Sequence, residues 1–216
     1  MSTLRYILDN WDTLGPQVLV HVEVVGICMA VAAVLGLGLG VLAAQSERFA
    51  AVVLAVTSTV LTVPSFALFG ILSIWFGLGE PPVLIGLVLY ALLPIVRNTR
   101  AGIVAVDPAV GEAARGMGMT PRQVLTRVQL PLAVPVILGG LRQATVMIVA
   151  VATVGAAVGV NDLGQPIFAA LTRDTGTLEQ VLAGIIPVAL IGIFADLILA
   201  AVQRGLSKGR VAVAAT

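Results

Sequence analysis

Long apolar runs separated by short polar connections dominate the chain and predict membrane-spanning helices. The hydrocarbon core of a bilayer is about 30 Å thick and needs about 20 apolar residues at 1.5 Å each. Five segments of this kind are present, and we expect spans at about 18–44, 50–79, 82–99, 130–159 and 181–203. The pattern therefore predicts an all-α, polytopic membrane protein with five transmembrane helices.

The two chain ends flank this membrane domain, which we place at residues 18–205. Residues 1–17 are polar and lack the basic-then-apolar form of a cleaved signal peptide. We therefore expect the first apolar segment to remain in the mature protein, with 1–17 as an extracytoplasmic segment and 206–216 as a cytoplasmic tail.

The cations of the connections and tails are distributed unequally between the two sides of the membrane. One side holds Arg48, Arg97, Arg100, Arg115, Arg122, Arg127, Arg204, Lys208 and Arg210, whereas the other holds Arg5 and Arg173. Cytoplasmic connections carry the excess of Lys and Arg. We therefore expect a multi-pass membrane protein with its N-terminus outside and its C-terminus in the cytoplasm.

Composition agrees with a membrane location and argues against chemistry within the chain. Hydrophobic residues make up 59% and charged residues 11%, against about 25% charged residues in a typical soluble domain. The lone Cys28 lies in an apolar run, and Cys/His clusters, G-x-S-x-G and H-E-x-x-H are absent from the sequence. We expect no catalytic residues, no metal site and no cofactor, and we do not interpret the chain as an enzyme.

The polar segment 107–131 between the third and fourth spans begins with the signals of a short helix. Asp107 precedes Pro108, which is typical of an N-cap with proline at the first helical position. Gly116 and Gly118 follow at the other end and are typical C-cap residues.

A second helix start follows immediately in the same segment. Thr120 and Gln123 have the spacing of a capping box, and we expect this helix to end before Pro131. The result is a rigid helix–Gly–helix projection at the cytoplasmic face. The alternative interpretation of the same pattern is an amphipathic hairpin at the membrane surface whose arginines contact anionic lipid.

The residues of this segment resemble the EAA loop of permease subunits of ATP-binding-cassette importers. Glu112, Ala113 and Ala114 are followed after three residues by Gly118, and after nine more by VQLP, with Val128 where the family has isoleucine. The stretches TVPSFALFGIL (62–72), LYALLPIVRNTRAGI (89–103) and LPLAVPVILGGLRQATV (130–146) extend the resemblance to the glycine betaine, choline and carnitine branch of osmoprotectant importers.

This resemblance implies the type I ABC importer permease fold, with a coupling loop at 107–131 that docks in a groove of a cytoplasmic ABC ATPase dimer. Glu112, Ala113 and Ala114 would face the groove, Gly118 would permit the turn, and the arginines would meet acidic residues or membrane lipid. A second permease subunit and an extracytoplasmic substrate-binding protein are the other implied partners; nucleic acid is not an expected partner. The resemblance also implies a location in the bacterial cytoplasmic membrane. The sequence contains no G-x-x-x-x-G-K-[ST], so the nucleotide site is expected on another chain.

Two charged residues lie inside expected spans, where charges mark function or a paired structural site. Arg142 is the only charge of the fourth span and Asp196 the only charge of the fifth, each in the cytoplasmic half. We expect them to form a pair, and structural pairing is favoured over substrate contact.

Pro64 and Ser65 interrupt the second span and free backbone carbonyls at membrane depth. Such groups either line a translocation path or mark a plain kink, and the sequence leaves both open. The glycines of 36–40 and 155–159 have the spacing of close helix contacts.

The remaining candidates are aromatic. We interpret His21, the single histidine, as an interfacial residue bonded to Glu23 rather than a ligand. Trp75, Phe76 and Tyr90 could present π faces to a quaternary ammonium, but positions near span ends favour interface anchors.

The leading hypothesis is thus an osmoprotectant importer permease. Alternatives are the same machinery importing another small solute such as an amino acid, an ATP-independent channel or secondary carrier, and a structural membrane adaptor.

Overall fold

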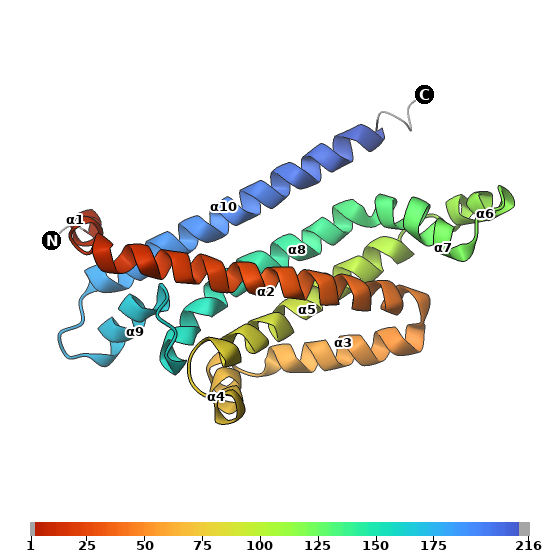
Figure 1. The fold of residues 1–216 in the computed structure, drawn as a ribbon. Coiled ribbons are helices and arrows are strands. Elements are labelled where there is room, and N and C mark those ends of the chain that lie inside the picture. Colours follow the sequence, from red (N-terminus) through yellow and green to blue (C-terminus); the bar gives the residue numbers. More distant parts are fainter. Residues whose placement is uncertain (1–2, 212–216) are drawn as a thin grey trace.

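The computed structural model describes residues 3–211, with side chains as far as Leu206, and its regular structure is entirely helical (Figure 1). In chain order the elements are α1 (Thr3–Asp9), α2 (Trp11–Gln45), α3 (Glu47–Thr62), α4 (Ser65–Phe76), α5 (Glu80–Val104), α6 (Pro108–Gly116), α7 (Pro121–Val124), the π-helical segment η1 (Leu125–Gln129), α8 (Leu130–Ala152), the 3-10 segment η2 (Thr153–Val158), α9 (Gly164–Thr172) and α10 (Leu178–Val211). The predicted all-α class is confirmed.

Four helices of the described chain are long and apolar enough to cross a membrane. They are α2, α5, the continuous helix over residues 121–158, and α10, and the bent pair of α3 and α4 is a fifth candidate. The helices extend beyond the expected spans because polar residues at both ends continue the helical hydrogen bonding. Residues 11–17 belong to α2, residues 206–211 of the expected tail continue α10, and residues 212–216 lie outside the described residues.

The second expected span is a bent pair rather than one rod. α3 ends at Thr62, and α4 leaves it at an angle of 99°. The cause is local: Val63 adopts an extended conformation (φ −69°, ψ 128°) before Pro64, because a residue preceding proline avoids the helical region and proline itself has no amide to donate.

The expectation that the second loop helix ends before Pro131 is wrong. η1 carries the chain from α7 directly into α8, and the Leu130 amide bonds to the Leu125 carbonyl in the wider π-helical pattern. Pro131 then falls in the first turn of α8, inside a helix that is continuous over residues 121–158. The second helix of segment 107–131 and the expected fourth span are therefore one helix.

α5 forms the centre of the bundle, packed between α2 and α8. Close approach of α2 and α5 depends on glycine. A Cβ at Gly36 would lie 2.7 Å from Ile95, and one at Gly40 would collide with Thr99. The predicted packing role is thus confirmed for Gly36 and Gly40, whereas a Cβ at Gly38 would meet no atom within 4 Å.

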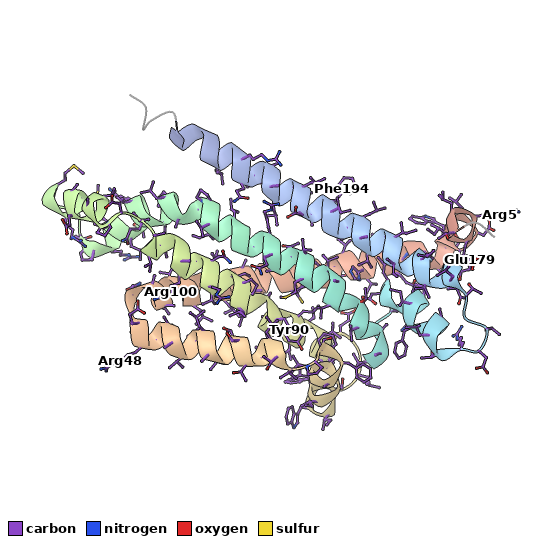
Figure 2. The ribbon with its side chains drawn as sticks, turned by 180° about the vertical axis from the view of Figure 1, so that it is seen from behind. Arg5, Arg48, Tyr90, Arg100, Glu179 and Phe194 are labelled. Carbon is purple, nitrogen blue, oxygen red and sulfur yellow. The ribbon has the colours of Figure 1, made fainter. Side chains whose placement is uncertain are left out.

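The bundle has two distinct ends (Figure 1). α6, α7, the α2–α3 turn and the end of α10 lie at one, which we name the loop end. α1 and α9 lie at the other, the α9 end. Arg48 and Arg100 lie at the loop end, and Arg5 and Glu179 lie at the α9 end (Figure 2).

Candidate functional site

The turn between α6 and α7 is fixed by hydrogen bonds at every helix end, beginning with α6. The Asp107 carboxylate accepts from the Ala109 amide at 2.9 Å. After α6, Gly118 has φ +85°, its amide donates to the Arg115 carbonyl at 2.9 Å, and the Met119 amide donates to the Ala114 carbonyl at 3.2 Å. This pair of bonds is a Schellman motif with glycine at the left-handed position, which confirms the predicted C-cap role of Gly118. Gly116 is instead the last residue of α6.

The start of α7 is fixed in the same way. The Thr120 hydroxyl accepts from the Gln123 amide at 3.3 Å, and the Gln123 side-chain oxygen accepts from the Thr120 amide at 2.8 Å. The predicted capping box is confirmed. Because both helix ends are satisfied locally, the direction of α6 relative to α7 depends mainly on Gly118.

The expected groove-facing residues divide into two groups. Glu112, Ala113 and Gly118 are exposed, whereas Ala114 is 3% exposed. Ala114 therefore lies inside the loop, and the expectation that it faces a partner's groove is wrong.

A cavity of about 560 Å³ lies beneath the loop, where the ends of α2 and α5 meet α6 and α7. Its polar lining includes Asp107, Arg115 and Arg122. Near it, the Arg100 guanidinium on α5 bonds both carboxylate oxygens of Glu47 at 2.6 and 2.7 Å. The cavity separates part of α6 from the ends of α2 and α5. The ion pair joins α5 to the α2–α3 turn.

The two intramembrane charges lie together on facing helices. Arg142 Nε donates to Asp196 Oδ1 at 2.8 Å, and Nη2 donates to Oδ2 at 2.9 Å, so the pair is bidentate. Arg142 Nη1 also donates to the Gln203 side-chain oxygen at 3.0 Å, and Gln203 Nε2 donates to the Pro135 carbonyl at 2.7 Å. The side chains of Arg142 and Asp196 are about one-third exposed. This network fastens α10 to α8 and uses the polar atoms of both charged groups internally.

The break between α3 and α4 is supported from α5. Pro64 is exposed and Ser65 half-buried, but the adjacent Val63 carbonyl accepts a hydrogen bond of 2.7 Å from the Tyr90 hydroxyl. That carbonyl is already used within the chain, which favours a structural role for it. Tyr90 lies close to the junction of α3 and α4 (Figure 2).

The aromatic candidates are not equivalent. Tyr90 is 3% exposed, so the interpretation of it as an interface anchor is wrong, and its ring is covered. Trp75 and Phe76 are 72% and 52% exposed at the end of α4, as expected for side chains that meet lipid or another subunit.

His21 is fully buried, and its interpretation as an interfacial residue bonded to Glu23 is wrong. His21 Nδ1 lies 2.9 Å from Asp162 Oδ2, and Nε2 lies 3.1 Å from the Val149 carbonyl oxygen. Asp162 is also fully buried, and its Oδ1 accepts from the Gly164 amide at 2.9 Å. The partner is 141 residues away in sequence, so local pattern reading chose the wrong acid.

A second polar contact lies beside this pair. Gln17, one turn before His21 on α2, donates to the Asn161 side-chain oxygen at 3.1 Å. Two polar pairs in the sequence could have indicated these contacts. Asn161 and Asp162 directly follow an apolar helix, and Gln17 and His21 lie one turn apart in α2. Among the described residues, no group of three His, Cys, Asp or Glu side chains is placed to hold a metal ion.

Comparison with known proteins assigns this architecture. Residues 36–208 match the family described as "Binding-protein-dependent transport system inner membrane component". The chain is 42% identical to the glycine betaine/carnitine/choline transport system permease protein OpuCD of Bacillus subtilis, over 82% of this chain and 76% of that protein. It is 36% identical to the osmoprotectant import permease protein OsmW of Salmonella typhimurium, over 94% of this chain and 96% of that protein.

A solved structure supports the fold independently of close sequence similarity. The structure of the MetNI methionine ABC transporter contains a chain that superposes with a TM-score of 0.79, at 19% identity, covering 90% of this chain and 96% of that one. The expected type I importer permease fold is thereby confirmed. This chain is a member of the family of inner membrane components of binding-protein-dependent transport systems.

Proposed function

We propose that this chain is the membrane-spanning permease subunit of an ATP-driven importer of osmoprotectants, taking glycine betaine, carnitine, choline or related quaternary ammonium compounds. The observation that carries the proposal is similarity to osmoprotectant permeases over nearly the full length of both chains. The family is a membrane component, so ATP hydrolysis is assigned to a separate ABC ATPase dimer, and solute capture to an extracytoplasmic binding protein.

The coupling loop supplies a physical route from ATPase to permease. Glu112 and Ala113 are exposed on α6, and the Schellman turn at Gly118 fixes the angle at which α6 is presented. A short helix held at a fixed angle suits a preformed groove, because little conformational freedom is lost on docking. The two ATPases and a second permease subunit, identical or different, complete the complex.

The intramembrane candidates receive different roles in this proposal. Arg142 and Asp196 act as a structural clamp between α8 and α10, because their charged groups satisfy each other. Pro64 and Ser65 remain candidates for the translocation path, with Pro64 exposed on the chain surface. Neighbouring lipid covers the remaining apolar surface.

The proposed orientation places the loop end in the cytoplasm. It is supported by the excess of Lys and Arg in connections at that end. Reporter fusions at Glu80 and at Gly118 are expected to report opposite compartments, with Glu80 outside. Signals from the same compartment at both sites would contradict the proposed orientation.

Reconstitution tests the proposed function directly. The chain, its ATPase, its partner permease and its binding protein are assembled in proteoliposomes with ATP on the ATPase side. We expect uptake of labelled glycine betaine, carnitine or choline that requires both ATP and the binding protein. Uptake without ATP would support a channel or secondary carrier instead, and uptake of amino acids alone would identify a different solute for the same machinery.

A further inference from the structure

A fully buried histidine on α2 reaches two segments that are distant in sequence. Val149 belongs to the last turn of α8, and Asp162 belongs to the turn 159–164 that leads into α9. Both His21 and Asp162 are 0% exposed. α2, α8 and the 159–164 turn therefore meet at one imidazole ring. This ring belongs neither to the coupling loop nor to the Arg142 network.

The hydrogen-bond partners determine how many protons the pair holds. A backbone carbonyl can only accept, so His21 Nε2 must carry a proton to bond Val149. A second proton must lie between Nδ1 and Asp162 Oδ2, because two bare acceptors at 2.9 Å would repel each other. That proton sits on the imidazole or on the carboxyl, and in either case the pair has no net charge.

Removing either proton breaks a bond and leaves a buried charge. The polar contacts of the His21 ring are those to Asp162 and to the Val149 carbonyl. Glu23 on α2 and Glu80 on α5 are exposed. α8 presents only the Val149 carbonyl to His21. Solvent and neighbouring charges thus have no direct route to the pair.

We infer that His21 is a positioning residue that holds the 159–164 turn against α2 and α8 as a two-proton, electrically neutral unit, and that it does not exchange protons during transport. The turn is otherwise attached to α2 by the Gln17–Asn161 bond. A Cβ at Gly164 would collide with the Thr153 carbonyl, so the turn already lies tightly against η2. The inference rests on the proposed function and deepens it, since it identifies the 159–164 turn as a part of the permease that stays in place during transport.

Nitrogen-15 NMR of histidine-labelled complex in lipid nanodiscs, prepared with a histidine-free affinity tag, tests the proton count. The His21 signals are assigned by their absence from the His21→Gln variant. We expect a proton on Nε2, bonded to the Val149 carbonyl, and a second hydrogen-bonded proton between Nδ1 and Asp162. A bare Nε2, or an Nδ1 without a hydrogen-bonded proton, would overturn the inference.

Hydrogen exchange of the same complex tests the positioning role. The amides of Gly159 and Val160 donate to carbonyls of η2, and the Gln165 amide donates to the Asp162 carbonyl, so these amides report opening of the turn. His21→Ala removes the imidazole from Asp162 Oδ2 and from the Val149 carbonyl, so these amides are expected to exchange at least about tenfold faster. Asp162→Asn is expected to keep native exchange within about twofold, because its amide can donate to Nδ1 and its oxygen can accept from Gly164.

A matched packing control is available on the same helix. Cys28 is also fully buried on α2, and its thiol makes only a 3.6 Å contact to the Leu84 carbonyl. Cys28→Ala should leave exchange of the turn unchanged. Equal acceleration in Cys28→Ala and His21→Ala would overturn the positioning role, as would acceleration in neither.

Uptake separates holding a proton from moving one. Asp162→Asn cannot pass a proton along the pair, so native uptake by this variant is expected. Loss of uptake with a protected turn would overturn the inference. The NMR and exchange results do not depend on which solute is carried, so failure of the proposed function would leave them interpretable.

Discussion

Replacing Gly118 with valine is expected to lower solute uptake by at least about tenfold while leaving membrane insertion intact. Gly118 has φ +85°, a conformation that costs a residue with a Cβ about 1–2 kcal/mol. A Cβ at this position meets no atom within 4 Å, so the strain arises from the backbone alone. Relieving it changes the Schellman turn and the direction of α6, and about 1.4 kcal/mol corresponds to a tenfold change in docking.

Two variants isolate this cause. Gly116→Val adds the same side chain two residues earlier, where the backbone is helical and a Cβ also meets no atom within 4 Å, so near-native uptake is expected. Gly118→Asn should retain most of the activity, because asparagine tolerates the left-handed region. Co-purification of the ATPase with each variant measures docking. Native docking and uptake by Gly118→Val would show that this turn is not the coupling joint.

Breaking the Arg142–Asp196 clamp from one side is expected to cause a large loss of folded permease. Arg142→Met leaves the Asp196 carboxylate without its bidentate partner and removes the bond from Arg142 to the Gln203 side-chain oxygen. Asp196→Leu leaves a guanidinium in the membrane with only Gln203. Either unpaired charge is unfavourable in an apolar setting. Each single variant should accumulate severalfold less folded protein, measured by size-exclusion of the solubilised complex.

The double variant distinguishes pairing from two independent roles. Arg142→Met with Asp196→Leu removes both charges, so we expect it to accumulate better than either single variant. As a control, Arg204→Met removes an exposed arginine from α10, the helix that carries Asp196. This variant should accumulate nearly as much folded protein as the native chain. If the double variant lost as much folded protein as the two single variants lose together, or more, the result would argue against the clamp.

Features governed by neighbouring residues could be predicted from the sequence. The caps at Asp107 and Thr120 and the left-handed Gly118 depend on contacts within five residues. The Arg142–Asp196 contact could be anticipated for a different reason. Each charge is alone in its expected span, in the cytoplasmic half of the membrane, and has few other ways to be satisfied.

Features set by contacts distant in the chain could not be predicted. His21 has an acid two residues away, and only the fold reveals that Asp162, far along the chain, is its partner. The buried position of Tyr90 depends in the same way on where α3 ends. The rule that helices stop before proline failed at Pro131, because a π-helical turn changed the register first.

The unbroken helix over residues 121–158 gives the molecule the mechanics of a lever. Thirty-eight residues at 1.5 Å each make a rod about 57 Å long, so a tilt of about 5° at one end displaces the other by about 5 Å. One end of this rod belongs to the coupling loop, and the other carries the carbonyl held by His21. The contact with His21 holds the far part of this rod in place. A displacement at the loop end would then rotate the span about that contact.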